Sequence, residues 1–372
     1  MNILFTTHHP AQIHCFRIAR SLLIEAGHSI FWLASEKDVS KSLLNYYQIE
    51  YGLLQRPGKG IFSKAKVLIS NTITSISFIR RHHIDMILSM GSPYLSLAGF
   101  FMRKSHISIE DTESTSIYDK VFCKFVSALL TAKSFGNTYR KDQIRFDGNL
   151  ELLYMHPKRF KPPEREKAAK LLGIKKEESY VIMRFVSWEA FHDRSLSGFS
   201  DDNKIKAVEA FSNFSKVFIS AEKTVPEEIQ EYLIQIPPEK MHDVLAHARL
   251  FFGESATMAS ESAVLGIPAI YLNENWLGYT DEEKEYGLLF SFKENTSDQL
   301  KAIQKGVELL KKHDLQKEMT HNRTRFLEKK IDVTGFLVWF IENWPESKKI
   351  MKEDPNYQNR FVYRSSGSYL PS

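Results

Sequence analysis

Short apolar runs alternate with longer segments of helical periodicity along most of the chain. The apolar runs predict buried strands, and the segments between them place apolar residues on one side of a helix, as Ile13, Phe16 and Leu23 do before the stop signal Gly27. Strands that alternate with helices predict right-handed βαβ units and parallel sheets covered on both faces. The strands are predicted at residues 3–6, 30–34, 85–90 and 105–109, and again at 180–186, 216–220, 248–252 and 268–272.

The alternation occurs twice, and residues 156–170, which are rich in proline and lysine, are interpreted as the linker between the two halves. A chain of 372 residues is also too long for one ordinary hydrophobic core. We therefore predict an α/β protein with two Rossmann-like domains facing a cleft, whose ligand-binding loops follow the carboxyl ends of the strands. The predicted parts are an N-terminal domain (1–160), a C-terminal domain (161–330), a C-terminal helix (331–347) and a loose polar tail (348–372).

A long helix is predicted at residues 63–83, with Ile69, Ile73, Ile76 and Ile79 on one side. Its end, and the later stretch 100–104, place basic residues beside aromatic and aliphatic ones. Such stretches are either sites of peripheral contact with an anionic membrane or the solvated ends of packed helices.

Composition narrows the class of protein. Hydrophobic residues at 43% and charged residues at 26% are normal for a globular protein. A net charge of +5 without a dominant run of lysine or arginine argues against a nucleic-acid partner. The two cysteines match no metal or redox spacing, and no segment reads as a signal peptide or a spanning helix, so we expect a cytoplasmic protein.

The most informative segment is 253–261, Gly-Glu-Ser-Ala-Thr-Met-Ala-Ser-Glu, between a predicted strand and a predicted helix. Small side chains at Ser255, Ala256 and Thr257, with Met258 behind them, let an anion approach backbone N–H groups at the positive end of the helix. This predicts a seat for a phosphate or pyrophosphate, and Glu261, one turn further on, would accept hydrogen bonds from sugar hydroxyls. The alternative is an ordinary helix start with a Ser or Thr cap.

Three histidines flank the first strand–helix turn, at His8, His9 and His14. A histidine at the carboxyl edge of a parallel sheet has a pKa suited to deprotonating a sugar hydroxyl. The alternative is that His8 and His9 lie in a surface loop and that His14 packs against the sheet.

A group of carboxylates, Glu110, Asp111 and Glu113, follows the strand predicted at residues 105–109. Neighbouring carboxylates raise one another's pKa and can act as an acid–base pair, and they also occur as solvated capping turns. Their spacing with histidine does not support a metal site.

Arg184 lies near the end of the strand predicted at residues 180–186, and Ser187 follows that strand. The planar guanidinium of Arg184 suits the oxygens of a pyrophosphate, although a structural salt bridge is the competing explanation.

The segment 260–269 resembles the donor-binding region of GT-B glycosyltransferases, which include the lipid-linked GlcNAc transferase of peptidoglycan synthesis, and of UDP-GlcNAc 2-epimerases. The resemblance implies that Glu261 binds the ribose and that residues 255–257 cradle the diphosphate. Almost the whole chain, to about residue 344, resembles domain-of-unknown-function family 354, with matching segments at 9–16, 184–190, 192–193 and 253–263. His14 falls where the transferases have a loop histidine, but the Gly-rich turn that accompanies it is missing here.

These observations predict a GT-B glycosyltransferase that uses a nucleotide diphosphate sugar, UDP-linked, for surface polysaccharide or glycoconjugate synthesis. The N-terminal domain would bind a saccharide or lipid-linked acceptor, with His14 or His9 as the base, and Arg184 would help residues 255–257 to hold the leaving diphosphate. No metal and no cofactor are expected, and the protein would be cytoplasmic or peripheral at the inner membrane face. One alternative is a nucleotide-sugar 2-epimerase, in which Asp111 would matter more, and another is a non-catalytic nucleotide-sugar-binding protein.

Overall fold

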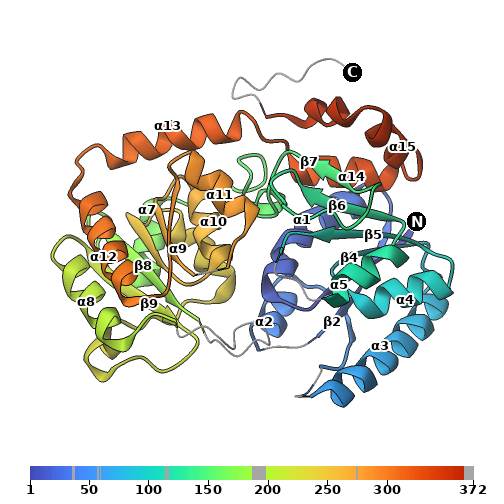
Figure 1. Ribbon diagram of the computed structural model, residues 1–372, viewed down its shortest axis with the longest axis horizontal. Coiled ribbons are helices and arrows are strands. Elements are labelled where there is room, and N and C mark those ends of the chain that lie inside the picture. The colour runs from blue at the N-terminus through green and yellow to red at the C-terminus, as the bar shows by residue number, and fades with distance from the viewer. Residues whose placement is uncertain are drawn as a thin grey trace. The chain divides into compact units, whose positions relative to one another are not determined.

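The computed structural model describes residues 1–35, 38–56, 58, 60–113, 117–186, 198–273 and 275–363, and these form two compact units (Figure 1). The first unit contains Met1–Arg159 together with Lys330–Ser372, and the second contains Phe160–Lys329. The chain therefore passes from one unit to the other twice.

The first unit is built on a parallel sheet of seven strands in the order β3-β2-β1-β4-β5-β6-β7. Its central strands are almost entirely buried, which explains why they appear in the sequence as continuous apolar runs. The strands are β1 (Asn2–Thr7), β2 (Ser29–Ala34), β3 (Gly52–Leu53), β4 (Met86–Met90), β5 (Ser105–Glu110), β6 (Ala128–Ala132) and β7 (Ile144–Phe146).

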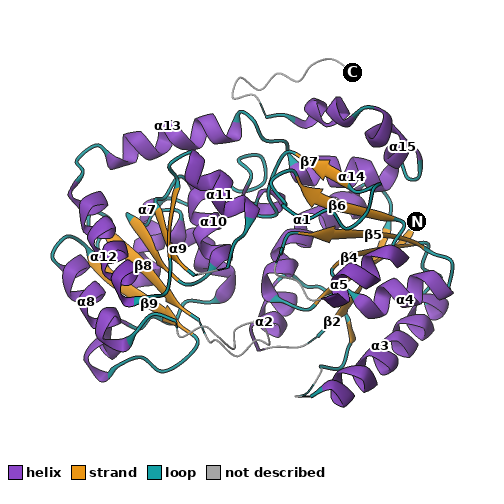
Figure 2. Ribbon diagram, viewed as in Figure 1, coloured by secondary structure: helices purple, strands orange, loops and turns teal. Residues whose placement is uncertain are grey.

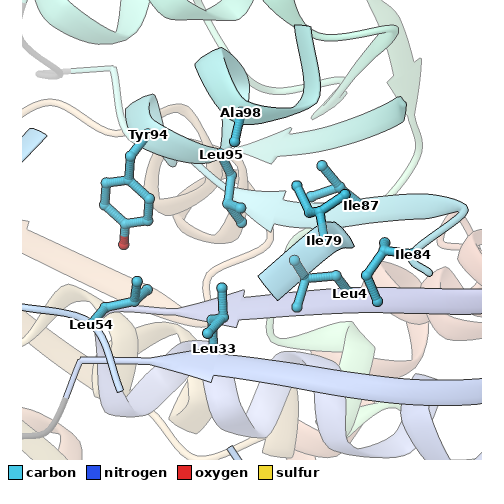
Figure 3. Packing of buried hydrophobic residues seen from close by; sticks show 9 residues of the cluster. All are labelled: Leu4, Leu33, Leu54, Ile79, Ile84, Ile87, Tyr94, Leu95 and Ala98. Carbon is cyan, nitrogen blue, oxygen red and sulfur yellow. The ribbon is translucent and has the colours of Figure 1, made fainter. Parts of the chain in front are cut away.

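Helices cover both faces of this sheet (Figure 2). They are α1 (Pro10–Glu25), α2 (Asp38–Tyr46), α3 (Ile61–Arg81), α4 (Pro93–Phe101), α5 (Ile117–Phe122), α6 (Leu152–Met155), α14 (Val333–Glu342) and α15 (Glu346–Glu353), with 3-10 turns at Cys123–Phe125 and Pro355–Phe361. Side chains that alternate along β1 divide between the two faces. Leu4 packs with Ile79 of α3 and Leu95 of α4 (Figure 3), whereas Phe5 packs with Phe16 of α1.

The second unit repeats the design with a parallel sheet of five strands in the order β12-β11-β10-β8-β9. The strands are β8 (Tyr180–Phe185), β9 (Lys216–Ala221), β10 (Leu250–Gly253), β11 (Ala269–Leu272) and β12 (Leu289–Phe292). The helices are α7 (Arg165–Leu172), α8 (Asp201–Ser212), α9 (Met241–Leu245), α10 (Ala256–Leu265), α11 (Gly278–Glu285), α12 (Thr296–Lys311) and α13 (Leu315–Leu327), with 3-10 turns at Glu227–Tyr232 and Pro238–Lys240.

Two segments differ from what the sequence predicted. The expected linker 156–170 already contains most of α7, because Ala168, Ala169 and Leu172 are buried and supply the apolar side of a helix. The expected loose tail from residue 348 contains most of α15 and a 3-10 turn, where Met351 and Gln358 are buried. Both segments are polar in composition, which predicts a loop, but a few buried residues are enough to fix a helix there.

Candidate functional site

The start of α10 lies where the strand order in the sheet of the second unit reverses. Strands β8 and β10 are neighbours, and the chain continues from β8 to β9 on one side and from β10 to β11 on the other. In open α/β sheets, ligands bind outside the carboxyl ends of the strands at such a point. The segment singled out in the sequence therefore occupies the position where a ligand site is expected.

Gly253, at the carboxyl end of β10, permits an unusually close approach of two strands. It is paired in register with Arg184 of β8, and a Cβ on it would lie 2.3 Å from the carbonyl oxygen of Arg184. Any side chain here would push β10 away from β8 and displace the helix start that follows.

Helix α10 begins with N–H groups that remain available to an anion. Ser255 is the N-cap, and its hydroxyl accepts a hydrogen bond from the N–H of Met258 at 3.3 Å. Within the described part of the chain, the N–H groups of Ala256 and Thr257 donate no hydrogen bond. These two donors, together with the positive end of a ten-residue helix, form an anion-binding arrangement.

Glu254 ties this turn to the loop that follows β8. Its carboxylate is buried and accepts hydrogen bonds from the N–H of Val186 at 3.0 Å and from that of Phe199 at 2.6 Å. Its own N–H donates to the carbonyl of Arg184 at 3.0 Å. One side chain thus holds both ends of the segment between residues 186 and 199 beside the start of α10.

Glu261 lies in the second turn of α10 and is 4% exposed. One of its carboxylate oxygens lies 2.8 Å from Nε2 of His242 in α9, which is also buried. This contact fixes the orientation of the carboxylate, so that the second oxygen keeps a defined direction. The sequence does not predict this contact between His242 and Glu261.

Arg184 is engaged by groups of the neighbouring strand β9. Its guanidinium donates to the hydroxyl of Ser220 at 2.7 Å and forms an ion pair with Glu222. Its Nε is buried and has no hydrogen-bond partner among the described residues. Ser187, the other predicted ligand of this loop, lies outside the described residues.

In the sheet of the first unit, the strand order reverses between β1 and β4. The loops after these strands meet, because the Tyr94 hydroxyl lies 2.6 Å from Nδ1 of His8. The Ser35 hydroxyl, after β2, is 3.5 Å from the same nitrogen. Burial lowers the pKa of His8 to about 4, so its ring is neutral at neutral pH. Tyr94 was not predicted, and its only signal is its place just after the strand-ending Gly-Ser-Pro at residues 91–93.

The other two histidines have different surroundings. His9 is exposed and is the N-cap of α1, where its ring accepts the N–H of Ala11 at 3.3 Å. His14 is 6% exposed inside α1, and its Nδ1 lies 3.4 Å from the Tyr47 hydroxyl.

The carboxylates predicted as an acid–base group follow β5, the neighbour of β4. Glu110 is buried beside Gly91, where a Cβ would lie 3.2 Å from its Oε1. Glu113 accepts the N–H of Gly136 at 3.2 Å. Burial raises the pKa of Asp111 to about 6; a hydrogen bond from the Thr112 hydroxyl at 2.9 Å opposes this, and the charge of Glu113 adds to it. Asp111 therefore titrates close to neutral pH, as an acid–base group must.

Among the described residues, no group of three or more His, Cys, Asp or Glu side chains could hold a metal ion. The anion-binding features in this part of the chain are backbone N–H groups and Arg184.

Comparison with known proteins places the fold. No family model and no curated sequence matches the chain. Solved structures do: the UDP-GlcNAc 2-epimerase of Neisseria meningitidis bound to UDP-GlcNAc is 12% identical over 96% of this chain and 100% of that one, with a TM-score of 0.64. MnaA of S. aureus in complex with UDP is 13% identical over 93% and 97% of the two chains, with a TM-score of 0.67.

A transferase belongs to the same set of similar structures. MurG of Acinetobacter baumannii is 14% identical over 92% of this chain and 99% of that one, with a TM-score of 0.56. The predicted α/β fold with two units of the GT-B type is thereby confirmed. Identities this low establish the fold alone, so the activity must be argued from the residues, and the resemblance to domain-of-unknown-function family 354 stays a prediction.

Proposed function

We propose that this protein is a glycosyltransferase of the GT-B type that transfers a sugar from a UDP-linked donor to a hydroxyl acceptor in surface polysaccharide or glycoconjugate synthesis. The observation that carries the proposal is the pair of available N–H groups on Ala256 and Thr257. They lie where the strand order of the second sheet reverses. Similar structures have been solved with UDP and with UDP-GlcNAc bound, which favours a uridine diphosphate as the anion.

The leaving diphosphate would be stabilised by these N–H groups and by the hydroxyls of Ser255 and Thr257. Such donors are already in place before the reaction, and they lower the barrier most where negative charge develops. Arg184 would add its charge by exchanging part of its contact with Glu222 for a phosphate oxygen. Met258 would line the same site, and the role of Ser187 stays a prediction from the sequence.

The acceptor hydroxyl would be bound by the first unit. A general base works best when its pKa lies near the working pH, and Asp111 at about 6 meets this condition better than His8 at about 4. We therefore propose Asp111 as the proton acceptor and His8, with Tyr94, as a neutral hydrogen-bonding pair. His9 and His14 remain the alternative bases, and His9 is the more accessible of the two.

The raised pKa of Asp111 also favours a second candidate, a nucleotide-sugar 2-epimerase, because proton transfer at a sugar ring needs a group that titrates near neutral pH. Incubation with UDP-GlcNAc and no acceptor separates the two activities. The 2-epimer, or UDP with a glycal, would identify an epimerase, whereas donor that is consumed only with an acceptor present would identify a transferase. Thermal stabilisation by UDP-GlcNAc without turnover for any acceptor would indicate a binding protein.

Replacement of Glu261 tests the ribose contact. We expect Glu261→Ala to weaken UDP binding about tenfold to a hundredfold, because hydrogen bonds to a charged carboxylate contribute ~1.5–3 kcal/mol. Isothermal titration of the folded variant measures this loss. Pyrophosphate, which lacks a ribose, is the matched ligand and should bind both proteins equally.

His242→Gln serves as the control for the buried pair, since it removes the partner of Glu261 and keeps the carboxylate. If UDP binds equally well to wild type and Glu261→Ala, the ribose assignment is wrong. Binding of pyrophosphate tests the phosphate site separately, because pyrophosphate has no ribose.

A further inference from the structure

Helix α3 of the first unit exposes several large apolar residues, and three of its four buried residues, Asn71, Thr72 and Ser75, are polar. Phe62 is 88% exposed, and Ile69 and Ile73 are each 62% exposed. Their spacing of seven and four residues places them on one side of the helix. On the opposite side Asn71 and Ser75 are buried. A helix that only covered a sheet would expose polar residues at positions 62, 69 and 73.

Asn71, on the buried side of α3, has structural partners. The amide of Asn71 accepts the N–H of Gln55 at 2.9 Å and donates to its carbonyl at 2.9 Å. Ile79, which the sequence predicts on the same side as Ile69 and Ile73, instead packs in the core of the unit (Figure 3). The orientation of α3 is therefore fixed from the inside, and its outward apolar side has to be explained by something else.

Helix α4 extends the same surface. It packs against α3 (Figure 1), and both helices contribute to the core cluster on one face of the sheet. Their outward sides therefore lie on the same side of the unit. Phe100 and Phe101, at the end of α4, are 55% and 64% exposed. We call the outward sides of the two helices, with the exposed residues Phe62, Ile69, Ile73, Phe100 and Phe101, the α3–α4 face.

Positive charge is concentrated around this face. Residues 51–109 contain eight lysines and arginines and a single acidic residue, Asp85, although the net charge of the whole chain is only +5. Lys66, Arg80, Arg81 and Arg103 are exposed, and none of them forms an ion pair within the part of the chain that is described. The remainder of the chain is slightly acidic.

We propose that the α3–α4 face docks on an anionic phospholipid bilayer, with its phenylalanines and isoleucines in the interface and its basic residues on the headgroups. Exposed apolar side chains flanked by lysine and arginine characterise helices that lie in a membrane surface. A second copy of the chain is a poor occupant, because it would bring the same positive charge against this face. No helix among the described residues is long and apolar enough to span a bilayer, and the proposed contact is a surface one.

The contact does not depend on the nucleotide-sugar activity, and it is tested without substrate by flotation of the full chain with vesicles. Wild type should bind vesicles of equal parts phosphatidylglycerol and phosphatidylcholine, and bind phosphatidylcholine alone at least tenfold more weakly, since each basic residue near an anionic surface strengthens binding about fivefold. Raising the salt from about 0.1 M to about 1 M should release most of the protein, because the Debye length falls to about 3 Å.

The variant Phe62→Ser/Ile69→Ser/Ile73→Ser should lose at least tenfold in vesicle affinity with an unchanged circular dichroism spectrum. The matched control is Leu171→Ser/Leu233→Ser/Leu300→Ser, three residues of the second unit that are 40%, 42% and 45% exposed, and it should bind as wild type does. A second variant, Lys66→Glu/Arg80→Glu, should lose the preference for anionic vesicles.

Three outcomes would overturn the proposal. They are the absence of wild-type binding to anionic vesicles, an equal loss in the control variant, and a dimer in sedimentation that the Phe62/Ile69/Ile73 variant abolishes, since the last would assign the face to a second copy.

Discussion

Glu254→Ala is expected to lower the free energy of unfolding of the second unit by ~3–5 kcal/mol, since each hydrogen bond to a buried charged group contributes ~1.5–3 kcal/mol. The variant leaves the N–H groups of Val186 and Phe199 without the acceptor that both share. Urea denaturation measures the loss. Hydrogen exchange should show faster labelling at these two amides, and UDP should bind more weakly because Val186 and Phe199 are no longer held beside the start of α10.

Two matched variants separate the buried contacts from the loss of charge. Glu254→Gln keeps one acceptor oxygen and should fall between wild type and Glu254→Ala. Glu222→Ala removes a carboxylate whose side chain is 41% exposed and should cost less than ~1 kcal/mol, as exposed ion pairs do. An equal cost for Glu222→Ala and Glu254→Ala would contradict the bridging role of Glu254.

The sequence predicts most of this fold because buried parallel strands leave a local signal. The apolar run at 250–252 and the glycine after it define β10 without knowledge of any neighbour. Strands β3, β6, β7 and β12 were not predicted. The last two have three and four residues, too few for any periodicity, and they are strands because a neighbouring strand supplies their hydrogen bonds.

The assignment of the C-terminal helices depends on contacts that no local pattern encodes. Helix α14 was predicted from its apolar residues, but its return to the first unit follows from Phe336 packing on Phe146, and from Arg159 pairing with Asp332 at the start of the helix. Both contacts join positions more than 170 residues apart. Sequence spacing carries no information about such pairs.

The candidate site also combines features that are local in the sequence with contacts between distant residues. The start of α10 was predicted because its cap, small residues and glycine are consecutive in the chain. The partners of its functional side chains come from elsewhere, as His242 does for Glu261 and Glu222 for Arg184. The contact between His8 and Tyr94 spans 86 positions, and it exists because β1 and β4 are adjacent in the sheet.

Asp111→Asn is expected to stabilise the protein at pH 7 and to abolish the proposed catalysis. Asp111 has a pKa of about 6 in the folded protein against its ordinary 3.8, so the folded state binds a proton more tightly than the unfolded state. Wild-type stability therefore decreases as the pH rises from about 4 to about 6, and the difference between the two pKa values corresponds to ~3 kcal/mol. Asparagine carries no charge to desolvate and should recover most of this at pH 7 and little below pH 4.

His8 gives the experiment a second readout with the opposite sign. Its pKa of about 4 lies below the ordinary 6.5, so its contribution to stability increases as the pH rises from about 4 to about 6.5. Burial also lowers the pKa of His106, to about 3, which acts in the same direction. In wild type these terms oppose that of Asp111, and in Asp111→Asn this opposition is removed. Urea denaturation across this pH range should show stability rising more steeply with pH in the variant.

Asp142→Asn is the matched control, because it makes the same chemical change in the same unit. Hydrogen bonds from Arg140 and Lys348 hold the pKa of Asp142 far below its ordinary value, so its replacement should destabilise the protein at pH 7. A gain from Asp111→Asn beside a loss from Asp142→Asn would identify Asp111 as a residue kept at a cost in stability, which is the pattern of a functional group. If Asp111→Asn left both the pH dependence and the turnover of UDP-GlcNAc unchanged, the burial of this carboxylate would have no role in the chemistry, and the base would have to be sought at His9 or His14.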